Sequence, residues 1–70
     1  MFIINELARF NKIQLQYLLE DETGPAHNKI FFVKLKLGDN EEYESSGTSI
    51  KKAQQAAAKI ALENTKYEMN

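Results

Sequence analysis

The stretch "IFFVKLKLG", residues 30–38, carries the clearest alternation of apolar and polar positions in the chain. Its odd-numbered positions are apolar and would share one side of a strand: Phe31, Val33, Leu35 and Leu37. The intervening positions are Phe32, Lys34 and Lys36. Aromatic and β-branched residues at a period of two are typical of a half-buried strand in an antiparallel sheet. The segment therefore predicts a strand that pairs with a neighbouring strand and has one face buried against other elements.

Turn residues flank this strand on both sides. The segment "GDNE", residues 38–41, predicts a tight hairpin because glycine, asparagine and aspartate tolerate positive φ. It leads to a short, polar third strand, "EEYESS", over residues 41–46. On the other side, "GPAHNK", residues 24–29, predicts a stiff loop that follows a first strand, "IQLQYLLE", over residues 13–20. The apolar residues that share one side of that first strand are Leu15, Tyr17 and Leu19.

Both ends of the chain have helical periodicity. In residues 2–11 the apolar face consists of Ile3, Ile4, Leu7, Ala8 and Asn11, with Phe10 at its border. In residues 48–67, which Thr48 or Ser49 can cap, the face consists of Ile50, Ala53, Ala57, Ile60, Ala61 and Asn64. The predicted fold class is α+β, in the order α-β-β-β-α. Two helices would pack on one face of a three-stranded antiparallel sheet.

Composition narrows the possible functions. Seventy residues predict one domain, residues 1–70. The sequence has no cysteine and one histidine, so we expect no disulfide, metal site or other cofactor. The longest apolar run is too short to span a membrane, and no secretion signal is evident. We therefore expect an intracellular, cytoplasmic protein with no membrane partner and no small-molecule substrate.

The charge distribution directs attention to the second helix. Residues 1–47 carry five basic and eight acidic side chains, a balance of −3, whereas residues 48–70 carry four lysines and two glutamates, a balance of +2. Lys51 and Lys52 lie in the first turn of the predicted helix, where the helix dipole is already positive. The N-terminus of the helix and the two ammonium groups together favour the binding of an anion such as phosphate. Gln54 and Gln55 add hydrogen-bonding amides one turn later.

His27 has three interpretations. It can be an idle loop histidine, a contact residue held at a stiff tip, or a general base. Catalysis requires a nucleophile or an orienting carboxylate beside the imidazole. The sequence supplies the nearby residues 20–22, "EDE", without a geometry that joins them to it. We therefore expect no enzyme activity and no catalytic residue.

The combined motifs resemble the double-stranded RNA-binding domain, and the resemblance runs over nearly the whole chain. A glutamate on the first helix, Glu6, is followed by Tyr17 in the first strand and by the loop "GPAH" at residues 24–27. The segments "SIKK", residues 49–52, and "AAAKIAL", residues 56–62, complete the pattern. Within that family the chain is similar to Staufen-type domains.

The resemblance implies a role for each polar cluster. Asn5 and Glu6 would meet ribose 2′-hydroxyls in one minor groove of an A-form duplex, and His27 and Pro25 would enter the next. The remaining contacts would come from lysines and amides near phosphates: Lys29, Lys51, Lys52, Gln54 and Gln55. The implied function is non-catalytic, shape-specific binding of double-stranded RNA within a Staufen-like RNA-transport or RNA-regulation protein.

One departure from the family pattern leaves a second hypothesis open. The usual basic trio at the start of the second helix falls on Ile50, Lys51 and Gln54, of which only Lys51 is basic. Ile50 is then a candidate core residue, and we expect weak to moderate RNA affinity. The alternative is a protein–protein or dimerisation module. Phe32 or Leu18, on the outer face of the sheet, would contact its protein partners.

Overall fold

The computed structural model describes residues 2–68, and it contains two helices and three strands in these residues. The elements are α1 (Phe2–Phe10), β1 (Leu15–Thr23), β2 (Ile30–Leu37), β3 (Glu41–Gly47) and α2 (Ile50–Asn64). The strands form one antiparallel sheet in the order β1-β2-β3. The predicted α-β-β-β-α order and fold class are therefore confirmed.

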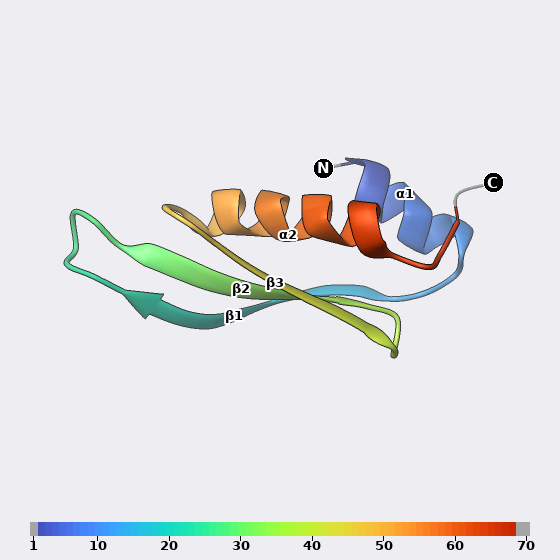
Figure 1. Ribbon diagram of the computed structural model, residues 1–70, viewed down its shortest axis with the longest axis horizontal. Helices are drawn as coiled ribbons and strands as arrows, with labels where there is room; N and C mark the ends of the chain where they lie inside the picture. Colours follow the sequence, from blue (N-terminus) through green and yellow to red (C-terminus); the bar gives the residue numbers. More distant parts are fainter. Residues whose placement is uncertain (1, 69–70) are drawn as a thin grey trace.

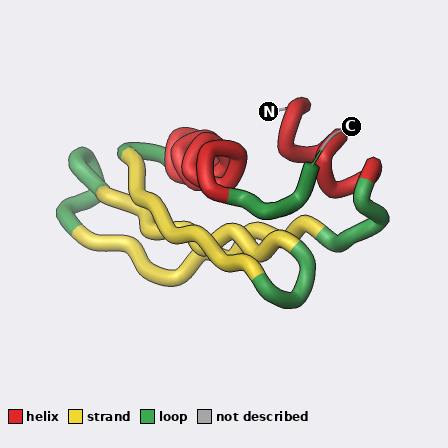
Figure 2. The backbone as a smooth tube through the Cα atoms, turned by 45° about the vertical axis from the view of Figure 1, so that its right-hand side comes forward, coloured by secondary structure: helices red, strands yellow, loops and turns green. Residues whose placement is uncertain are grey.

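The two helices lie on the same side of the sheet (Figure 1). The longer helix, α2, packs on β2 and β3, and α1 contacts α2 near its C-terminal half. Figure 2 shows α1 beside α2 rather than above it, so the molecule has two layers. Because α2 covers β2 and β3, part of the helix-side face of β1 stays open.

The core lies between α2, α1 and the middle strand. Its fully buried large side chains are Ile4, Val33, Leu35 and Leu37. Four alanines of α2 complete it: Ala53, Ala57, Ala58 and Ala61. Small side chains let the helix axis approach the sheet closely, which explains the alanine-rich face of α2. The alternation in β2 is confirmed, since Val33, Leu35 and Leu37 all point into this core.

A β-bulge changes the end of β1. Leu19 pairs with Val33 and Asp21 pairs with Phe32, so Glu20 is an extra residue in β1. A bulge bends a strand and redirects its side chains. Leu15, Tyr17 and Leu19 pair with core-facing residues of β2, so they share one side of β1 as predicted. Leu15 and Tyr17 are half-buried, whereas Leu19 is 50% exposed because α2 does not extend over this part of β1.

The observed ends of the elements differ from the predicted ones by a few residues. The first helix ends at Phe10 because Lys12 adopts a φ of 56°, which a helix does not allow. The first strand begins two residues later than predicted and continues through the bulge to Thr23. The second helix is shorter than residues 48–67 at both ends. Three residues predicted on apolar helix faces are exposed instead: Ile3, Ile50 and Asn64.

Of the two predicted caps, Thr48 and Ser49, it is Ser49 that caps the start of α2. Its backbone is extended, and its Oγ accepts a hydrogen bond of 3.1 Å from the Lys52 amide. Ser49→Ala is expected to lower the free energy of unfolding by about 1 kcal/mol, because that amide loses its partner. Urea denaturation measures the change, with Thr48→Ala as the matched control. An equal loss in both variants would contradict the assignment of Ser49 as the cap.

A carboxylate joins the β2–β3 hairpin to the segment after α2. Glu41 accepts hydrogen bonds from the Tyr43 hydroxyl at 2.8 Å and from the Lys66 amide at 2.9 Å. Burial favours a higher pKa for Glu41, but hydrogen bonds from Thr65, Lys66 and Tyr43 outweigh it and hold this pKa below 4.5. Burial, together with the hydrogen bond to Glu41, raises the pKa of Tyr43 to about 12. The ionised carboxylate therefore stabilises the fold at neutral pH.

This contact predicts a pH dependence of stability. A carboxylate with a lowered folded-state pKa stabilises above its unfolded pKa and loses that contribution as pH falls through the folded value. Glu41→Gln is therefore expected to be less stable than the parent chain near neutral pH. The difference should shrink as the pH falls through the acidic range in which Glu41 takes up a proton, first in the unfolded chain and then in the folded one. Urea titrations across this range measure it, and a constant difference would contradict the proposed linkage.

Two negative findings concern the described residues. None of the helices in residues 2–68 combines the length and apolar character needed to cross a membrane. The same part of the chain holds no cluster of three or more histidine, aspartate or glutamate side chains arranged to bind a metal ion.

Candidate nucleic-acid interface

The first helix presents its polar residues away from the core. Ile4, Leu7 and Ala8 are buried, whereas Asn5 and Glu6 are exposed. This follows from the helical period, which places positions 5 and 6 outside the arc that positions 4, 7 and 8 define. Both side chains are therefore free to reach a molecule that lies along α1.

The start of α2 presents the cationic residues of the site. Lys51 and Lys52 are both exposed in its first turn, directly after the Ser49 cap. That turn contains no aspartate or glutamate, so no side-chain charge compensates the positive end of the helix dipole there. The first turn can thus supply both ammonium groups and backbone dipoles to an anion.

The fold brings residues of α1 and α2 to one cleft. A hollow of about 200 Å³ is lined by Asn5 from α1, by Tyr17 from β1 and by Lys51, Gln54 and Gln55 from α2. Residues that are about fifty positions apart in the sequence thus line one surface. The lining holds amide groups, one hydroxyl and one ammonium, so it offers both hydrogen-bond donors and acceptors.

Tyr17 was not among the predicted contact residues. It lies on the helix-side face of the edge strand, below the gap between the two helices, and burial raises the pKa of its hydroxyl. The hydroxyl therefore stays protonated and can donate a hydrogen bond at neutral pH. Alternation along β1 placed Tyr17 on this face, but the gap above it depends on where α1 and α2 pack.

The β1–β2 loop has a defined turn. Gly24 has a φ of 95°, and a Cβ at this position would collide with the Asn28 carbonyl oxygen. The Asn28 amide donates a hydrogen bond of 2.9 Å to the Pro25 carbonyl, which closes the turn around His27. Pro25 and His27 are exposed. Figures 1 and 2 show that this loop bends towards the helix side of the sheet, at the end where α2 begins.

Lys29 lies at the base of this loop and has an ionic partner. Its Nζ is 3.0 Å from Glu22 Oε1, and both side chains are partly exposed. An exposed ion pair of this kind contributes little to stability and exchanges readily with other ions. Lys29 therefore has a smaller share of free positive charge than Lys51 or Lys52.

The predicted contact residues are thus distributed over three segments. Asn5, Lys51, Gln54 and Gln55 converge on the cleft, whereas Glu6 and Lys52 are exposed but do not line it. The loop residues lie beyond the start of α2, and α1 lies towards the other end of the molecule (Figure 1). The molecule is elongated, with principal extents of 43 × 20 × 16 Å. The segments follow its long axis, as contact along an extended partner requires.

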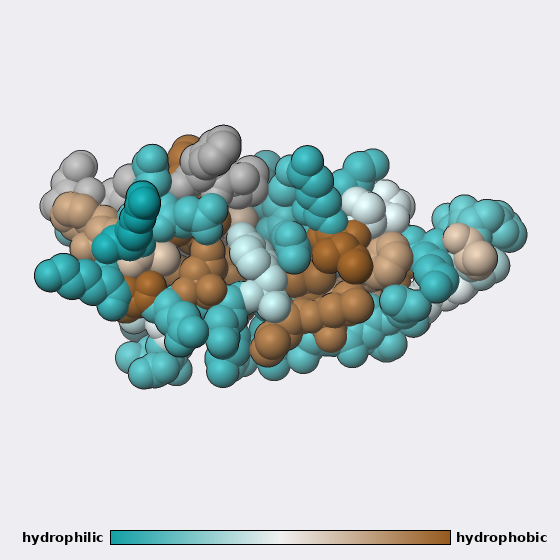
Figure 3. Space-filling model, turned by 180° about the vertical axis from the view of Figure 1, so that it is seen from behind, coloured by the Kyte–Doolittle hydropathy of each residue, from teal (hydrophilic) through white to brown (hydrophobic). Residues whose placement is uncertain are grey.

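An exposed apolar side chain lies beside the lysines at the start of α2. Ile50 is 42% exposed at the first position of α2, so its expected place in the core was wrong. Figure 3, which views the molecule from behind, shows an apolar patch in the middle of this side with hydrophilic atoms around it. A side chain that could carry charge at position 50 would therefore extend into solvent.

Comparison of this sequence with protein-family models and with known proteins agrees with this architecture. The family model described as "Double-stranded RNA binding motif" matches residues 3–65. The Staufen homolog of Aplysia californica, a "Double-stranded RNA-binding protein" by name, is 71% identical over 94% of this chain, which corresponds to 7% of that protein. The "Maternal effect protein staufen" of Drosophila melanogaster is 58% identical over 96% of this chain and 6% of its own length.

A bacterial relative extends the comparison to a protein with an enzyme's name. Ribonuclease 3 of Myxococcus xanthus is 40% identical over 87% of this chain and 24% of its own length. This chain therefore spans a small part of each of these relatives. The family match over residues 3–65 and the α-β-β-β-α fold together show that the chain belongs to the double-stranded RNA binding motif family and is similar to the domain found in Staufen proteins.

Proposed function

We propose that residues 1–70 act as one domain that binds double-stranded RNA, recognises mainly its shape, and catalyses no reaction. The observation that carries this proposal is the convergence of Asn5 with Lys51, Gln54 and Gln55 on one cleft, on the helix side towards which the His27 loop bends. Contact residues on one side of an elongated molecule suit a rod-like partner. The family membership of the chain identifies duplex RNA as that partner.

Each segment has a chemical role in the proposed complex. The 2′-hydroxyls in the shallow minor groove of A-form RNA both donate and accept hydrogen bonds. Asn5 and Glu6 are therefore assigned to one minor groove, and His27 with the Pro25 backbone to the next. Lys51 and Lys52 are assigned to phosphates of the intervening major groove, with Gln54 and Gln55 as neutral neighbours. Lys29 joins them after it leaves Glu22.

The proposed role is binding rather than catalysis, and membership of the double-stranded RNA binding motif family supports it. A longer Staufen-like protein engaged in RNA transport or regulation in the cytoplasm is the proposed setting. The 58–71% identity to the two Staufen relatives supports this setting. Shape-led recognition in that setting would let one domain bind many duplexes of different sequence.

A titration tests the proposal directly. The domain is mixed with a duplex RNA of about 20 bp, the DNA duplex of the same sequence and single-stranded RNA. We expect binding to duplex RNA that weakens with salt, and weaker binding to the other two nucleic acids. Equal binding to all three would contradict shape recognition. No binding at low salt, together with a concentration-dependent dimer, would contradict RNA binding altogether.

The loop has its own prediction. His27→Ala is expected to weaken duplex RNA binding about threefold, because it removes one neutral or charge-assisted hydrogen bond at an exposed tip. Fluorescence anisotropy with labelled duplex measures the change. Asn28→Ala is the matched control at the adjacent loop position, where the backbone makes the turn. A larger loss in the Asn28 variant would mean that loop shape, not the imidazole, matters.

A further inference from the structure

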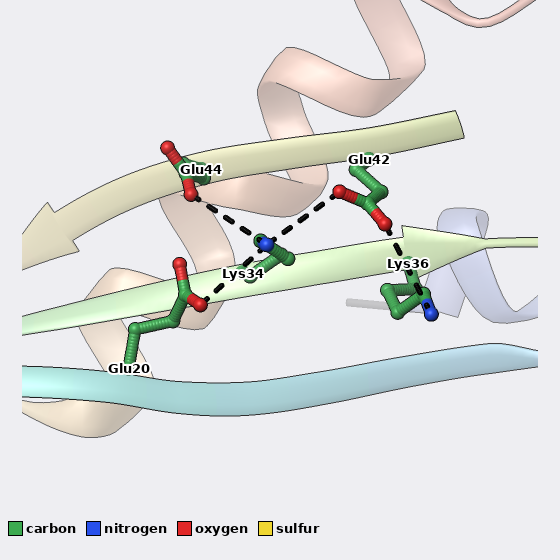
Figure 4. Close-up of polar contacts among 5 residues, drawn as sticks. All are labelled: Glu20, Lys34, Lys36, Glu42 and Glu44. Carbon is green, nitrogen blue, oxygen red and sulfur yellow. Dashed lines mark ion pairs between the residues drawn. The ribbon is translucent and has the colours of Figure 1, made fainter. Parts of the chain in front are cut away.

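The outer face of the sheet, opposite the helices, carries an ion network. Lys34 Nζ lies 3.5 Å from Glu20 Oε2, 3.5 Å from Glu42 Oε1 and 3.9 Å from Glu44 Oε2 (Figure 4). Lys36 Nζ adds a contact of 3.9 Å with Glu42. One ammonium group thus serves carboxylates from β1 and β3 on both sides of the central strand. This arrangement leaves the carboxylates in excess.

The bulge in β1 increases this excess. Because Glu20 is the extra residue, Glu20 and Asp21 both line a hollow of about 470 Å³ on this face, although consecutive residues of a regular strand point to opposite faces. Glu44 borders the same hollow from β3. The neighbouring Glu20 raises the pKa of Glu44 through a shared hydrogen bond and charge repulsion. The four carboxylates and two lysines of the face leave a net charge of −2.

An aromatic side chain lies in the same hollow. Phe32 borders it and is 39% exposed, and Leu18, on the same face of β1, is 44% exposed. A phenyl ring beside carboxylates is the environment that a guanidinium group prefers, because the ring attracts the cation and the carboxylates accept its paired hydrogen bonds. Lysine fits less well, since its ammonium group cannot stack on a ring.

We infer that this acidic–aromatic hollow, lined by Glu20, Asp21, Phe32 and Glu44, docks an arginine side chain of a partner protein. The charge excess supplies the complementarity, and the exposed ring selects guanidinium. The hollow lies on the opposite side of the sheet from the proposed RNA contacts on α1 and α2. The domain could then hold RNA and a protein segment at once. This inference does not depend on RNA binding.

Amide chemical-shift mapping with a hexa-arginine peptide tests the inference, with hexa-citrulline as the neutral control of equal shape. We expect saturable shifts at residues 20, 32 and 44 with the arginine peptide alone. Phe32→Ser and Glu44→Gln should each lower the affinity for the arginine peptide about threefold. Glu63→Gln, which removes an exposed charge from α2, should leave the affinity unchanged.

Three outcomes would overturn the inference. Shifts spread over all acidic residues, with equal losses in the Glu63 and Glu44 variants, would indicate attraction without a site. Unchanged binding by a folded Phe32→Ser variant would exclude the stacking contact. Shifts at the same amides on raising the protein concentration without peptide, together with a dimer in sedimentation, would assign this face to a second copy of the chain.

Discussion

Lys51→Glu is expected to weaken binding of double-stranded RNA about 30- to 100-fold, equivalent to about 2–2.7 kcal/mol. Lys51 is exposed in the first turn of α2 and lines the cleft that also contains Asn5. The substitution removes a charge-assisted contact with phosphate and adds a repulsive carboxylate at the same position. Fluorescence anisotropy at several salt concentrations measures both the affinity and its salt dependence, which should become shallower.

Urea denaturation of the Lys51→Glu variant distinguishes a loss of RNA binding from a loss of folding. A glutamate in the first turn of a helix interacts favourably with the helix dipole, by about 0.3–1 kcal/mol. Lys51→Glu should therefore unfold at the same or a higher urea concentration than the parent chain. Lys59→Glu makes the same charge change two turns further along α2, where the side chain is also exposed. If the two variants lose the same affinity, net charge rather than a phosphate contact at Lys51 determines binding.

Most of the fold was predictable because its signals are local. The alternation in residues 30–37 identified the buried face of β2, and Ser49 was recognisable as a possible cap before α2. The α-β-β-β-α order followed from the periods of the segments and from the turns between them. The resemblance to the RNA-binding domain then suggested contact residues, of which Asn5, Lys51, Gln54 and Gln55 do line one cleft.

The features that escaped prediction depend on tertiary structure. The bulge at Glu20 is a mismatch between two strands, so neither strand shows it alone. Leu19 is exposed because α2 covers β2 and β3 but not this part of β1. Tyr17 enters the cleft only because the helices leave a gap above it. The same reasoning applies to Ile50, whose apolar side chain favoured a core position that the path of α2 does not provide.

The exposure of Ile50 leads to a gain-of-function prediction. Ile50→Lys is expected to strengthen binding of duplex RNA about tenfold at about 50 mM salt, because a lysine there neutralises one further phosphate and releases its counterions. The gain should diminish as salt rises, and the slope of log affinity against log salt should steepen by about 0.9. Since Ile50 is 42% exposed, the change creates no cavity in the core. Anisotropy titrations at about 50 and 200 mM salt measure the effect.

A matched control is available on the other side of the sheet. Leu18→Lys adds the same charge at a side chain of similar exposure, 44%, on the outer face. If Ile50 lies at the RNA surface, only Ile50→Lys should steepen the salt slope by a full phosphate contact, whereas Leu18→Lys should change affinity by less than about twofold. Equal gains in both variants would show that the added charge acts at long range, and the start of α2 would then lose its assignment to the major-groove phosphates.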